Sequence, residues 1–311
     1  KRRWRFVLCG SSARKLRRTG ANLLPGRSFL HRLYPLTTAE HPVDPPAPPH
    51  GASPLPLPWQ GGGRPVRPFP AWDLETRLAY GALPGVVAGE EEDRAEVLKA
   101  FAVVHLEEEI RREALVKDWG AFVRFLQLAA RESGRVLHYA AVSQETGLSQ
   151  PTVKSHYQLL EDMFIGFRVQ AFSGSPRKGL LSTPKFLLFD LGVRHAAAGL
   201  TPSPDVVRAD PGPLLEQWVG IELWKRLQYL GDGSLSYLRT KDGAEIDFIV
   251  ERRQEWIPIE VKWSERPALS DARHLLAFCR EHPKKARQGY LVCRCSRPLQ
   301  LHDQVTALPW N

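Results

Sequence analysis

The sequence predicts an α/β protein built from several domains, and three stretches of the chain support this prediction. Residues 73–132 carry apolar side chains at helical spacing. Residues 139–190 read as two short helices followed by two strands. Residues 213–311 alternate helices with strands, which is typical of a mixed sheet flanked by helices. A chain of 311 residues is long enough for two or three such domains.

The positive charge is concentrated at the beginning of the chain. The formal net charge is +9, and residues 1–40 contain ten Lys and Arg residues but one acidic residue. Residues 41–311 are therefore neutral overall. The basic segment is expected to attract anions, either nucleotide phosphate or nucleic acid, whereas the net charge says nothing about the rest of the chain.

The composition excludes several classes of protein. Hydrophobic residues make up 43% and charged residues 25% of the chain, as in ordinary globular proteins. The sequence has no run of eighteen apolar residues and no visible secretory signal, so we expect no membrane span. The four cysteines form neither a metal-ligand pattern nor a disulfide framework. We therefore expect a cytoplasmic protein with reduced thiols.

Residues 41–70 mark the clearest boundary in the sequence. They contain eleven prolines and three consecutive glycines, a composition that cannot build a packed core. We expect an extended linker or an insertion there. The alternative is a ligand for a proline-binding module.

Residues 71–135 are expected to be helical. One apolar face at helical spacing consists of Val97, Leu98, Phe101 and Val104. The run E-E-E-I-R-R-E at 107–113 places acids and bases four positions apart, which favours a solvated helix face. The alternative is a cluster of carboxylates that binds a metal.

Residues 136–200 carry the pattern of a winged helix-turn-helix. Residues 139–146 and 150–162 read as its two helices, and Ser149 can cap the second one. The side chains of the second helix that we expect to meet DNA are Gln150, Thr152, Lys154, Ser155 and His156.

Strands at 165–172 and 185–190 would hold the wing between them, with Arg177 and Lys178 at its tip. Residues 139–185 contain five basic and three acidic residues, a small excess for a DNA-binding domain. The alternative is therefore a winged helix that serves for packing or oligomer formation alone.

Residues 241–262 contain the most informative pattern. Asp247 lies on one expected strand, and Glu260 and Lys262 lie on the next. Strand residues two positions apart point to the same face, so Glu260 and Lys262 project together. If Asp247 shares that face, two carboxylates and an ammonium meet there, and the carboxylates suit Mg²⁺ or Mn²⁺. Such a metal can polarise a phosphodiester and lower the pKa of an attacking water. The alternative is a hairpin with a surface ion pair.

This spacing of aspartate, glutamate and lysine resembles the PD-(D/E)XK nuclease superfamily. The resemblance implies that residues 205–311 form a nuclease-like domain in which Asp247, Glu260 and Lys262 are catalytic. It also implies a metal-binding glutamate on the preceding helix, where Glu216 is the best match and Glu222 the second choice. The metal ligands would then be Glu216, Asp247 and Glu260. Ile246 stands where the superfamily has a proline.

The order of all these segments resembles the C-terminal part of a prokaryotic AAA-type ATPase family that carries the domain of unknown function 4143. The matching stretches are F-V-L-C-G-S-S-A-R-K-L at 6–16, L-P-G-R at 24–27, Y-G-A-L-P at 80–84, L-E-E-E-I at 106–110 and S-Q-P-T-V at 149–153. The resemblance implies that residues 1–40 are the end of the ATPase core, residues 41–70 an insertion and residues 71–135 its helical lid.

Two nucleotide-binding roles follow from the same resemblance. Ser11 or Ser12 would sense the γ-phosphate, and Arg27 would act as an arginine finger toward a neighbouring subunit. The alternatives are a helix cap at the serines and a local ion pair at Arg27. No G-x-x-x-x-G-K-[ST] loop occurs in the sequence, so we expect a fragment that uses ATP only within the intact protein.

These observations predict a DNA-binding protein with metal-dependent phosphodiester hydrolysis, and homo-oligomers formed through the ATPase part. One alternative is a non-catalytic DNA-binding or regulatory ATPase module whose nuclease-like fold only binds. A further alternative is a protein-interaction scaffold.

Overall fold

The computed structural model describes residues 31–41, 43–44, 69–112, 116, 118–173, 183–240 and 243–311. The side chains of His105, Glu107 and Arg112 are not part of this description. Most of the basic segment and of the proline-rich segment therefore lies outside the described residues. The described part is a mixed α/β fold in which helices surround an eight-stranded sheet.

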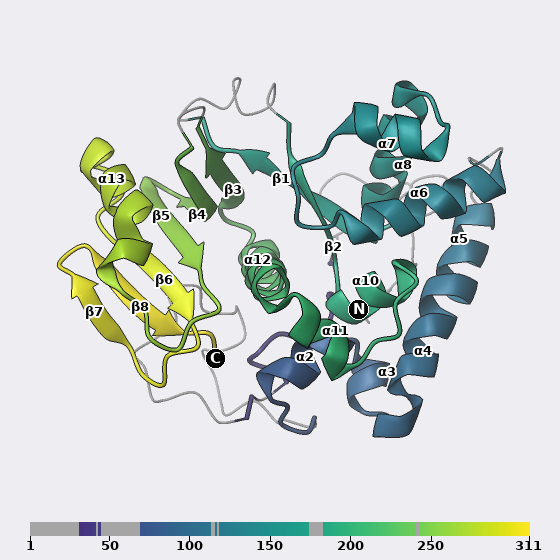
Figure 1. Ribbon diagram of the computed structural model, residues 1–311, viewed down its shortest axis with the longest axis horizontal. Coiled ribbons are helices and arrows are strands. Elements are labelled where there is room, and N and C mark those ends of the chain that lie inside the picture. Colours follow the sequence, from purple (N-terminus) through teal and green to yellow (C-terminus); the bar gives the residue numbers. More distant parts are fainter. Residues whose placement is uncertain are drawn as a thin grey trace, which may run out of the picture.

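Short helices form one side of the molecule, away from most of the sheet (Figure 1). They are α2 (Leu74–Tyr80), α3 (Pro84–Val87), a 3-10 turn (Glu91–Asp93), α4 (Arg94–Ala100), a π-helical turn (Phe101–His105), α5 (Leu106–Arg112) and α6 (Trp119–Arg131). The carboxylates of Asp73 and Asp118 accept hydrogen bonds from the first turns of α2 and α6, which satisfies backbone donors that have no partner inside the helix. Within the described part of the chain, no helix is long and apolar enough to span a membrane.

The apolar face expected along α4 and α5 is partly wrong. Leu98 is fully buried, whereas Val97 and Val104 are 43% and 59% exposed. The π-helical turn explains the position of Val104, because its wider turn rotates the following residues relative to an ideal α-helix. A helical period of 3.6 residues in the sequence does not reveal such a π-helical turn.

Helices α7 (Tyr139–Thr146) and α8 (Gln150–Asp162) have the bounds expected from the sequence. Gly147 ends α7 with a φ of 73°, a left-handed conformation that glycine adopts at little cost. The Ser149 hydroxyl accepts a hydrogen bond from the Thr152 amide and so caps α8. His156 is 8% exposed and packs against the rings of Phe122 and Phe125, so its expected contact with DNA is wrong.

The sheet has the strand order β2-β1-β3-β4-β5-β6-β8-β7. The strands are β1 (Gly166–Ala171), β2 (Lys185–Leu188), β3 (Ser234–Arg239), β4 (Glu245–Arg252), β5 (Glu255–Val261), β6 (Gly289–Cys293), β7 (Leu299–His302) and β8 (Val305–Pro309). Parallel pairing of β1 with β3 joins the two predicted domains, because Gln170 lies opposite Ser236. The boundary expected near residue 200 therefore does not interrupt the sheet.

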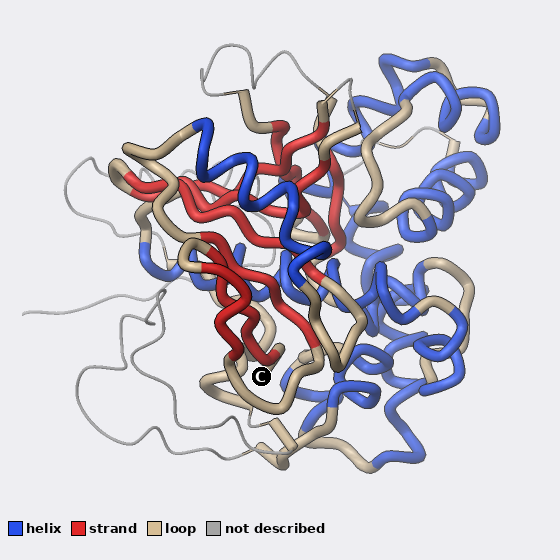
Figure 2. Tube along the Cα trace, turned by 60° about the vertical axis from the view of Figure 1, so that its left-hand side comes forward, coloured by secondary structure: helices blue, strands red, loops and turns tan. Residues whose placement is uncertain are grey.

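Helices cover both faces of this sheet (Figures 1 and 2). The connection from β2 contains α10 (Leu191–Ala197) and α11 (Pro204–Ala209), and leads into the long helix α12 (Pro211–Leu230). Leu215 of α12 is buried in one apolar cluster with Phe248 of β4. A 3-10 turn (Leu269–Ala272) and α13 (Arg273–Glu281) supply a second cluster, in which Leu275 joins Ile249. Strand β4 is thus buried from both sides.

Two glycines of α12 allow a test of how closely this helix approaches the sheet. A Cβ atom at Gly220 would lie 2.5 Å from the Phe248 ring, whereas one at Gly212 would have no neighbour within 4 Å. We expect Gly220→Ala to lower the free energy of unfolding by about 1–3 kcal/mol through overpacking. The control Gly212→Ala should raise it by up to about 1 kcal/mol, because alanine restricts the unfolded chain. Urea unfolding of both variants measures the difference, and equal effects would contradict the close packing.

Candidate functional site

Asp247 and Glu260 lie opposite each other on β4 and β5. Phe248 pairs with Ile259 in the antiparallel register, which places Asp247 across from Glu260. Asp247 is 8% and Glu260 is 6% exposed. The Val261 amide donates a hydrogen bond of 2.8 Å to Oδ2 of Asp247. The expectation that these two carboxylates share one place in the fold is therefore confirmed.

Lys262 lies directly after β5 and contacts Glu260. Its Nζ atom is 2.7 Å from Oε1 of Glu260, so the prediction that these two side chains project together is confirmed. Burial lowers the pKa of Lys262, but the hydrogen bond and the charges of Glu260 and Asp247 more than offset this and raise it. Lys262 is therefore an ammonium ion held at the carboxylate pair, with 41% of its side chain exposed.

Glu216 is the third carboxylate near Asp247 and Glu260, because, in addition to burial, its charge raises the pKa of Asp247. Burial raises the pKa of Asp247 well above its usual value, and the charges of Glu216 and Glu260 raise it further. The same burial raises the pKa of Glu260, although Lys262 opposes this. Oε2 of Glu260 is buried without a hydrogen-bond partner. The negative charge of Glu216, Asp247 and Glu260 is therefore only partly compensated by the hydrogen bonds that these side chains form.

The two glutamates of α12 have different surroundings. Glu216 lies at the carboxylate cluster, and its Oε1 atom is 2.8 Å from Nζ of Lys185. Glu222 instead forms ion pairs of 2.9 Å with Lys225 and Arg226 and accepts hydrogen bonds from Thr38. Burial raises the pKa of Glu222, but these two cations lower it overall. Glu222 therefore fixes the segment around Thr38 to α12, and Glu216 is the glutamate of the candidate site.

Lys185 is a member of this cluster that the sequence analysis missed. It begins β2 and is 4% exposed, with its ammonium 5.2 Å from the centre of the Tyr237 ring. Burial lowers the pKa of Lys185, but Glu216, Asp247 and Glu245 raise it overall. The sequence contained a signal for this role. Lys185 begins the otherwise apolar strand K-F-L-L, and a lysine buried in such a strand requires a carboxylate partner.

The described residues contain no group of three or more His, Cys, Asp or Glu side chains that are placed to hold a metal ion together. In the cluster, Lys185 neutralises Glu216 and Lys262 neutralises Glu260. Asp247 lies between them, with a hydrogen bond from the Val261 amide. Cys279, Cys293 and Cys295 are buried free thiols elsewhere in the fold.

Most of the candidate DNA-binding side chains of α8 lie on its outer surface, whereas His156 is buried. Gln150 and Lys154 are exposed, and the Lys154 ammonium is 5.3 Å from the centre of the Tyr139 ring. Thr152 is partly buried and shares a hydrogen bond with the Ser149 hydroxyl. The remaining predicted site residues, Ser11, Ser12, Arg27, Arg177 and Lys178, lie outside the described residues.

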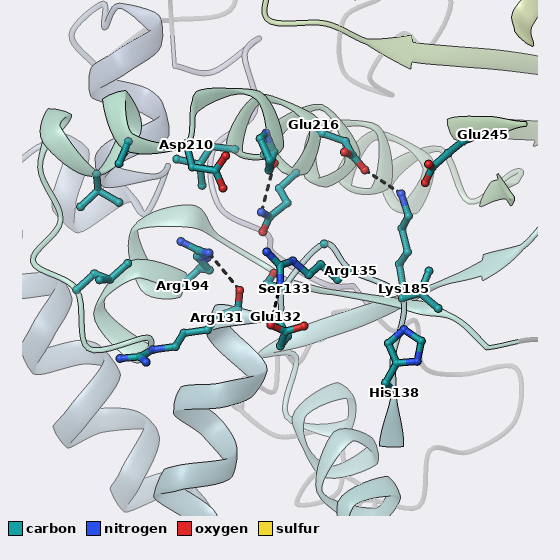
Figure 3. Close-up of a pocket in the computed structure, with 18 of the residues that line it drawn as sticks. Arg131, Glu132, Ser133, Arg135, His138, Lys185, Arg194, Asp210, Glu216 and Glu245 are labelled. Carbon is teal, nitrogen blue, oxygen red and sulfur yellow. Dashed lines mark hydrogen bonds and ion pairs between the residues drawn. The ribbon is translucent and has the colours of Figure 1, made fainter. Parts of the chain in front are cut away.

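A pocket of about 690 Å³ reaches the carboxylate cluster from the side of the helices (Figure 3). We call it the Arg194 pocket. It is lined by the end of α6 and the residues after it, by β2 and α10, by the α11–α12 region, and by the end of β3 and the start of β4. Its residues include Arg131, Arg135, Lys185, Arg194, Glu216 and Arg239. Lys185 and Glu216 lie at one end of it, and Arg131 and Arg194 lie toward the other (Figure 3).

Two family matches divide the chain near α11. Residues 71–204 match "Domain of unknown function (DUF8612)", and residues 211–311 match "Domain of unknown function (DUF4143)". The predicted presence of the second domain is thereby confirmed. The Arg194 pocket lies where the two matched regions meet, since Lys185 belongs to the first and Glu216 to the second.

The chain is also similar to curated bacterial proteins. An uncharacterised protein of Mycobacterium tuberculosis is 22% identical over 86% of this chain and 54% of its own length. An uncharacterised protein of Haemophilus influenzae is 24% identical over 82% of this chain and 58% of its own length. The chain thus spans little more than half the length of these relatives. No solved structure matches it significantly.

Proposed function

We propose that this chain is part of an ATP-dependent DNA-binding protein whose C-terminal domain hydrolyses phosphodiesters with the help of a divalent metal. The observation that supports this most strongly is the burial of Asp247 beside Glu216 and Glu260, which raises its pKa. Buried carboxylates with raised pKa values occur at functional sites as well as in structural ion-pair networks, which makes this cluster a candidate site. A nuclease-like fold alone would not support an activity, so the proposal depends on this cluster.

The residue types of the cluster suit a divalent cation, although the three carboxylates are not placed to hold one together in the described structure and would have to move toward it. Glu216, Asp247 and Glu260 supply the oxygen ligands that Mg²⁺ or Mn²⁺ prefers, and Oε2 of Glu260 is buried without a partner. A metal bound by these residues would polarise the phosphodiester and lower the pKa of the attacking water. Lys185 would have to release Glu216 for this, because the two are 2.8 Å apart.

Lys262 would act on the substrate rather than on the carboxylates. Hydrolysis forms a bond from a water oxygen to phosphorus and breaks the bond to the leaving oxygen, which takes up a proton. Negative charge grows on the phosphoryl oxygens during this exchange, and the Lys262 ammonium is held where it would stabilise that charge. Glu260 would orient it through their contact of 2.7 Å.

The remaining parts would deliver DNA and energy. In this proposal α7, α8, β1 and β2 form a winged helix that meets DNA through Gln150, Thr152 and Lys154, together with the wing residues Arg177 and Lys178. Residues 1–40 would complete an AAA-type ATPase core in the intact protein, with Ser11 or Ser12 and Arg27 at its nucleotide. Similarity to bacterial proteins that are about one and a half times as long as this chain supports a longer intact protein.

Lys262→Met tests the hydrolysis directly. We expect it to lower the rate of DNA cleavage in Mn²⁺ or Mg²⁺ by roughly a hundredfold or more, because a preorganised charge at the transition state is lost. Metal affinity, measured by titration calorimetry, should not fall, because Lys262 is not a proposed metal ligand and its loss removes a cation that competes for Glu260. The whole chain is used, with EDTA as the blank and the exposed Lys284→Met as the control for general charge loss. Equal cleavage by Lys262→Met and the wild type would contradict the proposed role.

A second candidate function is a nuclease-like domain that only binds nucleic acid or regulates the ATPase. It is favoured by the lysine partners of Glu216 and Glu260, which leave no described carboxylate group of three placed for a metal. This candidate predicts no metal binding and no cleavage in the wild type. It further predicts that Lys154→Ala weakens DNA binding, whereas Lys262→Met leaves binding unchanged.

A further inference from the structure

The Arg194 pocket contains positive charge that the proposed hydrolysis does not use. Four acidic residues line it, against five Lys and Arg residues. Glu132 contacts Arg135 at 3.0 Å and Glu216 contacts Lys185 at 2.8 Å, whereas Asp210 and Glu245 form no ion pair within the described part of the chain. Arg131, Arg194 and Arg239 also line it, and none of them forms an ion pair with a carboxylate among the residues that the structure describes. These three arginines face one cavity from α6, α10 and β3.

The guanidinium groups of Arg131 and Arg194 form hydrogen bonds to backbone carbonyls. Nε of Arg131 donates to the Ala198 carbonyl at 3.1 Å, and Nη2 of Arg194 donates to the Arg131 carbonyl at 3.4 Å (Figure 3). Nε of Arg194 is buried without a hydrogen-bond partner. Burial lowers the pKa of Arg194, with Asp210 opposing the shift and Arg135 adding to it. Asp210 thus compensates Arg194 in part without forming an ion pair, and an anion in the pocket would supply the direct partner that the guanidinium groups of Arg131 and Arg194 lack.

Another part of the lining is apolar. It consists of Leu200, Val206, Ala209, Pro213 and Leu214. A volume of about 690 Å³ is within the range of pockets that enclose small ligands, and it is far too small for a DNA duplex, which is roughly 20 Å wide. An apolar wall suits the flat face of a base, and the arginines suit a phosphate.

We propose that the Arg194 pocket binds the terminal nucleotide of a single DNA strand. The base lies against the wall formed by α11 and α12, and the phosphate lies at Arg131 and Arg194. The adjoining phosphodiester then reaches Glu216, which lines both the pocket and the carboxylate cluster. This inference rests on the proposed hydrolysis and adds that cleavage begins at strand ends.

Binding in EDTA tests the pocket independently of catalysis. The whole chain is titrated with thymidine monophosphate, with a linear oligothymidylate and with a covalently closed circle of the same length. We expect the linear strand to bind at least tenfold more tightly than the circle, and the mononucleotide to compete with it. Arg194→Gln should weaken linear-strand binding at least tenfold, whereas Arg280→Gln, on the exposed side of α13, should have no effect.

A second variant guards against misfolding. Arg239 is exposed, so Arg239→Gln should leave thermal unfolding unchanged while weakening binding several-fold. Equal affinity for the circle and the linear strand would overturn the proposal, even if the mononucleotide binds. If the protein cleaves circles and Arg194→Gln does not change this cleavage, the pocket proposal is overturned, whereas the proposed hydrolysis is not. End-specific binding without any cleavage would support the pocket and refute the hydrolysis.

Discussion

Asp247→Asn is expected to remove divalent-metal binding and at the same time to stabilise the metal-free protein. Asparagine keeps the size of the side chain and an oxygen that can accept the hydrogen bond from the Val261 amide. It removes a buried charge that lies near the carboxylates of Glu216 and Glu260. We expect the affinity for Mg²⁺ or Mn²⁺ to fall at least a hundredfold, and the free energy of unfolding at pH 7.5 to rise by about 0.5–2 kcal/mol.

The pH dependence of this stabilisation follows from the direction of the shift. Burial and the neighbouring carboxylates raise the folded-state pKa of Asp247 above 3.8. The folded protein therefore binds the Asp247 proton more tightly than the unfolded chain does, and ionisation costs folding free energy as the pH rises above about 3.8. The advantage of Asp247→Asn should be absent below that pH, grow through the folded-state pKa and stay constant above it.

Calorimetry and urea unfolding of the whole chain measure the two effects together. Asp232→Asn is the matched control, because Asp232 pairs with Arg252 at 3.1 Å and its side chain is 39% exposed. Surface changes of this kind usually alter stability by less than about 0.5 kcal/mol. If Asp247→Asn lost stability and the wild type bound no metal, the cluster would be a structural network, and the binding-only function would take precedence.

The sequence was sufficient to predict the local parts of this site. Asp247, Glu260 and Lys262 belong to one hairpin of two antiparallel strands. Their relative positions therefore follow from hydrophobic alternation and from their spacing in the sequence. The contact between Lys262 and Glu260 depends on a separation of two positions along the chain. The bounds of α7 and α8 were equally accessible, since Ser149 and Gly147 mark them by capping chemistry.

Features that depend on distant parts of the chain could not be predicted in this way. The pairing of β1 with β3 joins residues that are separated in the chain by β2, α10, α11 and α12, and no local pattern specifies it. Lys185 is 31 positions from Glu216, so its role becomes visible only once β2 is placed beside α12. The π-helical turn at 101–105 moved Val104 out of the predicted apolar face, and the periodicity of the sequence does not reveal such a turn.

Lys185→Met is the second change from which we expect a large effect. The Lys185 ammonium is buried and offsets the charges of Glu216, Asp247 and Glu245, so its removal leaves buried carboxylates without compensation. Breaking a buried pair in this way typically costs about 3–5 kcal/mol of folding free energy. Metal affinity should rise at least tenfold, because Glu216 no longer has a competing cation. Saturation with Mg²⁺ at about a hundred times its dissociation constant should restore roughly 2.7 kcal/mol.

The double variant Lys185→Met/Glu216→Gln separates this electrostatic effect from a loss of packing. If charge is the cause, the double variant should be more stable than Lys185→Met alone by about 1–3 kcal/mol, since the pair is coupled. Lys154→Met, on the exposed surface of α8, serves as the control and should change stability by less than about 0.5 kcal/mol. Strictly additive costs at Lys185 and Glu216 would mean that their contact of 2.8 Å contributes little. Lys185 would then fill space under Tyr237, and a metal would not have to compete with it.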